Sequence, residues 1–192
     1  MRNLKTLLSD LDPLPYFTRE PGGTPAAERV RLVLLDPGLD MDPWTEAYLY
    51  AAARADLVRR EILPRLENGK VVLCERFLDS SLAYQGAGRG LGLAAVRELN
   101  ARAVGGVAPN LTFYLRLSAE ERARRAQASG APLDRIEKVG DEFMRRVEEG
   151  FEVVARSEPY RVRMLDATLS PDRLAESARK EILKLRSAGG NV

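Results

Sequence analysis

Residues 71–90 read VVLCERFLDSSLAYQGAGRG, and this stretch indicates both a fold and the position of a site. An apolar run from Val71 to Cys74 ends at an acid–base pair, Glu75 and Arg76, and a polar, glycine-rich stretch follows. Buried parallel strands are short apolar runs, and open α/β sheets bind ligands beyond the carboxyl ends of their strands. There Arg76 could fork onto phosphate oxygens, while Glu75 could hold Mg²⁺ through water or orient an attacking oxygen. A plain strand-end ion pair fits the same spacing, so both interpretations stay open at this point.

The composition is that of one globular domain of ordinary size. The chain has 192 residues, 45% hydrophobic and 30% charged, which is enough to bury a core. Its 30 basic and 28 acidic residues nearly cancel, so nucleic-acid binding is not favoured. The absence of histidine excludes histidine-based triads and argues against zinc. Cys74 is expected to be a buried thiol in a reducing compartment, and with no membrane span or signal pattern a cytoplasmic location is expected.

Helical and strand-like segments alternate along the chain, without an internal repeat or a low-complexity linker. Short apolar runs predict strands at 16–19, 71–74, 111–117 and 162–165. Apolar periodicity predicts helices, including one that starts near Asp79 or Ser80, and the others at about 2–11, 26–35, 43–66, 93–103, 120–125, 141–156 and 171–186. This alternation predicts a single α/β domain over 1–192, with a parallel sheet covered by helices on both faces. Residues 187–192 are expected to form a frayed tail.

Four motifs resemble, in order and spacing, those of the bacterial thymidylate kinase family. They are TREPGGTP at 18–25, EAYLYAAARA at 46–55, ERF with DSSLAYQG at 75–86, and LDRIE at 133–137. The resemblance covers about residues 2–185. It implies a P-loop-type α/β fold that phosphorylates dTMP to dTDP with ATP and Mg²⁺, usually as a homodimer.

The resemblance implies a thymine site on the helix at 43–66. Tyr50 and Arg54 lie four residues apart and therefore face the same way. By resemblance Tyr50 stacks on thymine and Arg54 donates to a base oxygen. Without the resemblance, a core tyrosine with a snorkelling arginine would be the favoured interpretation.

The resemblance also implies an acceptor-phosphate site around Arg76, whose planar fork of donors suits a phosphate. Glu75 stands where an aspartate is usual, which leaves its metal–water geometry open, and Phe77 stands where a tyrosine is frequent. Tyr84 is assigned to deoxyribose selection. The other residues implied to contact the nucleotide are Arg19, Glu20, Pro21, Ser80, Ser81 and Gln85.

Simpler interpretations exist for some of these residues. Ser80 could be only a helix N-cap, since serine and aspartate are favoured there. Arg19 could be a solvated turn charge. The Glu20-Pro21 bond resembles a cis peptide bond of the family, a form that occurs almost only before proline.

Residues 122–140 resemble the family's lid over ATP. Gln127 and Ser129 stand where arginines are common, which leaves Arg125 and Arg135 as candidates to stabilise the transferring phosphoryl group. A solvated basic face is the alternative. Asp166, Ala167 and Thr168 resemble the loop near the adenine.

The motif that would hold the donor phosphates is absent from the sequence. Nucleoside monophosphate kinases need a strand followed by G-x-x-x-x-G-K-[ST], in which backbone amides and the lysine hold the phosphates and the hydroxyl holds Mg²⁺. None of the five lysines has the required glycines before it. Alignment places Met1 just after the expected loop, so the family's first strand, central between those at 71–74 and 111–117, is also expected to be missing.

Two interpretations of this absence are open. The chain could be a shortened form of an ordinary enzyme, or a truncated or degenerate non-catalytic relative that binds a nucleotide or a partner. Loss of a central strand would cost more than the ~5–15 kcal/mol by which domains are stable, which favours missing residues over evolved loss. Glu75, Gln127 and Ser129 lie outside the missing piece and keep the second interpretation open.

Overall fold

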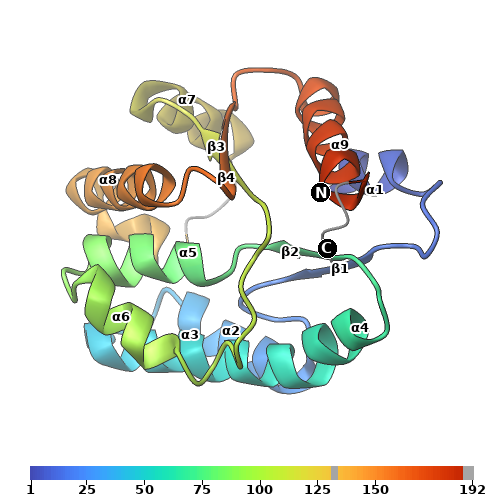
Figure 1. Cartoon of the computed structure of the whole chain (residues 1–192). Coiled ribbons are helices and arrows are strands. Elements are labelled where there is room, and N and C mark those ends of the chain that lie inside the picture. The colour runs from blue at the N-terminus through green and yellow to red at the C-terminus, as the bar shows by residue number, and fades with distance from the viewer. Residues whose placement is uncertain (131–133, 188–192) are drawn as a thin grey trace.

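The four strands form two parallel pairs. A computed structural model describes residues 1–130 and 134–187. In it β1 (Tyr16–Arg19) pairs with β2 (Val72–Glu75), and β3 (Thr112–Arg116) pairs with β4 (Val162–Asp166) (Figure 1). The predicted strands and their parallel pairing are confirmed. In the described ranges β2 and β3 are not hydrogen-bonded to each other, and this break lies where the strand expected to be missing would be placed. The expected absence of a first strand and P-loop stays a prediction.

Helices pack around both strand pairs. In the view of Figure 1, α2, α3, α4 and α6 lie below β1 and β2, whereas α7, α8 and α9 lie above them. The helical bounds in chain order are α1 (Arg2–Leu7), α2 (Pro25–Leu35), α3 (Pro43–Leu57), η1 (Val58–Ile62), α4 (Leu63–Glu67), α5 (Leu78–Ser81), η2 (Leu82–Gly88), α6 (Leu93–Asn100), α7 (Ala119–Ser129), η3 (Glu137–Val139), α8 (Asp141–Ser157) and α9 (Pro171–Ser187). No helix of the described ranges is both long and apolar enough to cross a membrane.

Local sequence signals explain where several helices begin. Thr24 accepts a hydrogen bond from the Ala27 amide at 3.1 Å, and Pro25 occupies the first turn of α2. Asp42 caps α3 in the same way, 2.8 Å from the Trp44 amide. The helix expected to start near Asp79 or Ser80 starts at Leu78 after Phe77 and has no side-chain cap, so the alternative of Ser80 as an N-cap does not hold.

The long helix expected at 43–66 is present but not uniform. Residues 58–62 are π-helical, and α4 begins immediately afterwards with Pro64 in its first turn. Proline lacks the amide of a normal helical hydrogen bond and clashes with the preceding turn. π-helical turns are rare and occur mostly as single turns inside α-helices, as this one does between α3 and α4. Periodicity alone does not distinguish this arrangement from a continuous helix.

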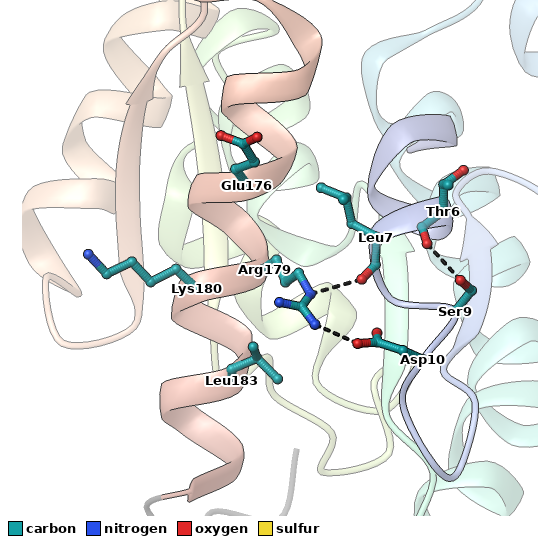
Figure 2. A pocket seen from close by; sticks show the side chains of 8 residues that line it. All are labelled: Thr6, Leu7, Ser9, Asp10, Glu176, Arg179, Lys180 and Leu183. Atoms are coloured by element: carbon teal, nitrogen blue, oxygen red, sulfur yellow. Dashed lines mark hydrogen bonds and ion pairs between the residues drawn. The ribbon is translucent and has the colours of Figure 1, made fainter.

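The first helix is shorter than the predicted 2–11 and packs against the last. Helix α1 ends at Leu7, and Leu8 is fully buried. Arg179 of α9 donates from Nε to the Leu7 carbonyl at 2.9 Å and from Nη2 to Asp10 at 2.6 Å. Figure 2 shows this cation between the two segments, beside a pocket of about 540 Å³. Arg179 therefore holds residues 1–10 against α9.

A buried polar cluster joins the two strand pairs. Arg161, just before β4, donates to both carboxylate oxygens of Asp79 at 2.7 and 2.8 Å. Thr112, the first residue of β3, also donates to Asp79 at 3.1 Å. Because Asp79 lies on α5, directly after β2, this cluster fixes the position of β3 and β4 relative to β2.

Close packing of η2 against α8 positions the segment that follows β2. Ala83 of η2 and Phe143 and Val147 of α8 belong to one buried apolar cluster. A Cβ atom on Gly150 would lie 2.7 Å from Ala87 Cβ and 2.9 Å from Ala83 Cα, so only glycine allows this approach. The packing fixes Tyr84 and Gln85, which lie on η2 between these contacts.

Candidate functional site

One pocket of about 460 Å³ gathers most of the residues that the sequence singled out. It lies beyond the carboxyl ends of β1 and β2, where open α/β sheets bind ligands. Every predicted substrate-binding residue except Arg19 lines it: Glu20, Pro21, Tyr50, Arg54, Arg76, Ser80, Ser81, Tyr84 and Gln85. The Glu20-Pro21 peptide bond is cis, as predicted.

Arg76 is the best-placed cation of this pocket for binding an anion. Its backbone φ is +66°, and no other non-glycine residue of the described ranges has a positive φ. Its Cζ atom lies 5.1 Å from the centre of the Tyr84 ring. Among the described side chains, no carboxylate lies within ion-pair distance of Arg76, so its donors stay available to a ligand. Backbone strain of this kind clusters at functional sites.

Arg54 is buried rather than snorkelling, with 1% of its surface exposed. Its Nε and Nη2 atoms donate to Glu20 at 2.6–3.1 Å, and Nη1 donates to Asn100. Burial raises the pKa of the Glu20 carboxyl, and the Arg54 charge opposes that rise. These bonds use three of the five guanidinium N–H groups, which leaves two for a ligand.

The two tyrosines that line the pocket differ in what their surroundings do. The surroundings of Tyr50 keep its phenol neutral, and those of Tyr84 fix the position of its ring. Burial raises the pKa of Tyr50 to about 12, with the Glu46 charge adding to the rise. The Tyr84 ring packs edge-on against Phe151, with centroids 6.0 Å apart. Tyr50 can therefore act as an uncharged stacking surface, and Tyr84 as a rigid wall.

Glu46 is a buried carboxylate behind the pocket that the sequence analysis did not assign a role. Its exposure is 0%, and three side chains donate to it. Gln85 Nε2 lies 2.8 Å from Oε1, and Arg89 Nη2 and Arg135 Nη2 each lie 2.7 Å from Oε2. In the sequence, Glu46 is only an acidic residue one helical turn before Tyr50, which does not predict a buried carboxylate. The residues that donate to it are 39 to 89 positions away in the sequence.

Four further lining residues, on α2 and α8, were not singled out in the sequence, and the rest belong to the predicted lid at 122–140. Arg31 and Leu35 are four apart on α2, and Asp141 and Met144 are three apart on α8. Arg122 of α7 lines the pocket as well and pairs with Glu148. The remaining lining residues are Ala123, Ala126, Asp134, Ile136, Glu137 and Gly140.

The structure does not bring the predicted catalytic arginines of the lid into the pocket. Arg125 is 45% exposed and pairs with Glu121 on its own helix. Arg135 is buried, where Nε donates to the Leu34 carbonyl at 2.8 Å and Nη2 to Glu46. Arg122 is the α7 arginine that lines this pocket, and the roles of Arg125 and Arg135 toward the donor phosphate stay predictions. Residues 131–133 of the predicted lid lie outside the described ranges, as do residues 188–192 of the predicted tail.

Three further predicted contacts also lie away from the pocket lining. Arg19 is exposed and pairs with Glu28 at 3.0 Å. Glu75 is exposed at the end of β2, and the described residues contain no cluster of three or more potential metal ligands. Thr168 donates from N and Oγ1 to Asp166 Oδ1 at 2.9 and 2.7 Å, so residues 166–168 form a compact turn after β4.

Comparison with known proteins identifies the family. The family model described as thymidylate kinase matches residues 1–178. The chain belongs to the thymidylate kinase family. A thymidylate kinase of Deinococcus radiodurans is 50% identical over 157 residues, covering 82% of this chain and 76% of the relative. One from Symbiobacterium thermophilum is 45% identical and covers 98% of this chain and 91% of the relative.

A solved structure shows the same relation. The crystal structure of thymidylate kinase from Ehrlichia chaffeensis aligns with a TM-score of 0.74 and 27% identity, covering 95% of this chain and 88% of that one. The α/β class and the parallel strands agree with a thymidylate kinase fold. The family is one of nucleoside monophosphate kinases, and these comparisons give no support to a non-catalytic relative.

Proposed function

We propose that this chain binds dTMP in the pocket at the ends of β1 and β2 and transfers the γ-phosphoryl group of ATP to it, giving dTDP. The observation that carries the proposal is the convergence of Arg76, Tyr50, Arg54 and Tyr84 on one pocket. Family membership supplies the reaction class.

The roles proposed for the pocket residues are those that the family resemblance implies, and the geometry of the pocket is compatible with them. Arg76 would hold the acceptor phosphate, because its fork matches phosphate oxygens and it has no competing carboxylate. Tyr50 would stack on the base, and the free N–H groups of Arg54 would donate to a base oxygen. Tyr84 would pack against the sugar edge, where a ribose would carry its 2′-hydroxyl.

The donor side of the reaction is proposed in less detail. ATP and Mg²⁺ are the co-substrate and cofactor expected of the family, and Mg²⁺ in such sites is held largely by substrate phosphates and water. Since the described residues contain no metal-ligand cluster, no step is derived through Mg²⁺, and the role of Glu75 stays a prediction. A cytoplasmic location is also part of this proposal.

A homodimer is the proposed assembly. Helices α2 and α3 carry exposed apolar side chains, among them Leu32 at 66%, Tyr48 at 59% and Val33 at 42%. A second copy covering this face would bury them. Light scattering on the purified chain should give twice the monomer mass, and Leu32→Glu with Tyr48→Glu should shift it to the monomer mass.

The kinase activity is tested by ADP formation from ATP with and without dTMP. The proposal predicts ADP formation that requires dTMP and falls at least ~10²-fold in Arg76→Ala, the loss typical when one preorganised donor at a reacting centre is removed. Turnover would also contradict our expectation that a G-x-x-x-x-G-K-[ST] loop is needed. Saturable dTMP binding without turnover would instead favour a nucleotide-binding role.

A further inference from the structure

The side-chain amide of Gln85 has one orientation available to it. Its Nε2 atom lies 2.8 Å from Glu46 Oε1, and the residue is 1% exposed. An ionised carboxylate only accepts hydrogen bonds, so the NH₂ group of Gln85, not its carbonyl, must face Glu46. The Gln85 carbonyl oxygen then points the other way.

Glu46 is held as an ionised group. Arg89 donates to both of its oxygens, at 2.7–3.2 Å, and Arg135 donates to Oε2 at 2.7 Å. Burial acts to raise the pKa of Glu46, but the bonds from Arg89, Gln85 and Arg135 outweigh it, so the net pKa lies below its ordinary value. At neutral pH the group facing Gln85 is therefore a carboxylate.

The Gln85 carbonyl is open to the pocket. Gln85 lines the pocket together with Tyr50 and Arg54, and no side chain of the described ranges donates to its Oε1 atom. The buried side-chain N and O atoms without a partner in those ranges are Thr18 Oγ1 and Glu148 Oε1. Gln85 Oε1 is not among them, so it keeps accessible surface where the residue meets the pocket.

We propose that Glu46 is a positioning residue that selects the pyrimidine base by fixing the Gln85 carbonyl toward the pocket. This inference rests on the proposed function. Thymine and uracil carry an N–H donor at N3, which an amide carbonyl can accept. Cytosine has a lone pair at N3, which the same carbonyl would repel. With cytosine bound, the buried Gln85 carbonyl would therefore be left without a hydrogen-bond donor, which costs binding free energy. Glu46 therefore acts through Gln85, without touching the substrate.

The test compares dTMP and dCMP binding in the wild-type chain and in Glu46→Gln by calorimetry. The wild type should prefer dTMP by on the order of tens of fold, the range expected for one unsatisfied buried polar group. A glutamine at 46 can accept from or donate to Gln85, so the amide can flip. In this variant the ratio of dTMP affinity to dCMP affinity should fall about ten-fold, because dCMP binding strengthens while dTMP binding weakens. General damage to the fold would weaken both.

A matched variant controls for disturbance of the buried cluster. Arg89→Lys keeps a cation beside Glu46 and leaves the Glu46–Gln85 bond in place, so the dTMP/dCMP ratio should stay at the wild-type value even if both affinities fall. If the ratio survives in Glu46→Gln, the inference is wrong and the proposed function stands. If the wild type does not bind dTMP, the proposed function fails and the inference with it.

A measurement on the wild type keeps the inference testable if Glu46→Gln does not fold. With dTMP bound, the Gln85 side-chain NH₂ protons should show nuclear Overhauser contacts to Glu46 and none to the base. Contacts from these protons to the thymine ring would show the opposite amide orientation and would contradict the inference.

Discussion

At the residue scale, Arg76 combines a strained backbone with a guanidinium that contacts Tyr84 and forms no ion pair with a carboxylate of the described ranges. A non-glycine residue at φ +66° costs of order 1–3 kcal/mol and persists only when the surroundings impose it. Stability and binding should therefore separate at this position. Arg76→Gly should unfold in urea with a free energy about 1 kcal/mol higher than Arg76→Ala, because glycine adopts positive φ without strain. Both variants should bind dTMP at least ~10-fold more weakly than the wild type. Equal stability of the two would contradict the strain.

Tyr50 should titrate abnormally. Its pKa is raised to about 12 in the folded chain, whereas an unfolded tyrosine titrates near 10. Because the raised pKa favours the neutral phenol, the stabilisation is complete below about pH 10 and is lost as the pH rises toward about 12. Ultraviolet absorbance of wild type against Tyr50→Phe should place one phenolate transition near pH 12. A difference spectrum that titrates near pH 10 would show that Tyr50 is not buried.

Some residues of the pocket could be predicted from the sequence, and others could not. Tyr50, Arg54, Arg76 and Tyr84 were predicted because each lies in a motif with a recognisable spacing. Glu46 was missed because its three donors come from two distant segments, around residues 85–89 and at Arg135, and no local pattern records such contacts. Arg135 was assigned to the donor phosphate by its motif. In the structure its guanidinium donates to the buried Glu46 carboxylate, a contact that depends on how the segments pack and that the motif does not record.

At the element scale, the contact of α8 with η2 fixes the pocket wall and depends on Gly150. Glycine to alanine inside a helix normally stabilises by up to about 1 kcal/mol. Here the added Cβ would lie 2.9 Å from Ala83 Cα, a backbone atom that cannot move aside cheaply. Gly150→Ala should therefore destabilise by about 1–3 kcal/mol in urea unfolding, as overpacking does. Val153→Ala, exposed on the same helix, should change stability by less than about 0.5 kcal/mol.

Element types were predictable where local periodicity dominates, as in α2, α8 and α9. The differences have physical causes. Helix α1 ends at Leu7 because Leu8 is buried and the following segment turns back against α9. The π-helical segment 58–62 precedes Pro64, and its geometry depends on how the chain accommodates a missing amide donor.

At the scale of the whole molecule, the Asp79–Arg161 pair links the two strand pairs. Both side chains are about nine-tenths buried, and Thr112 of β3 shares the carboxylate. Asp79→Ala should cost about 3 kcal/mol, because Arg161 keeps Glu158 but loses its second carboxylate in a buried position. Glu142→Ala, which breaks exposed pairs on α8, should cost less than about 1 kcal/mol. Equal costs by thermal unfolding would show that the link does not hold the strand pairs together.

The whole fold was predictable in class but not in sheet connectivity. Alternating helices and strands predicted an α/β domain with parallel strands, which the structure confirms. In the described ranges β2 and β3 do not pair, and the alignment places the strand expected to be missing between them. Which strands pair with each other, β1 with β2 and β3 with β4, depends on backbone hydrogen bonds between segments far apart in sequence.

The central claim is that the pocket around Arg76 is a dTMP site, and calorimetric titration with dTMP tests it most directly. The account predicts one saturable site per chain, with affinity at least ~10-fold weaker in Arg76→Ala, the loss expected for a charge-assisted hydrogen bond. Arg125→Ala, which changes an exposed arginine paired on its own helix, should bind like the wild type. No saturable binding of dTMP, or equal binding by Arg76→Ala, would contradict the account.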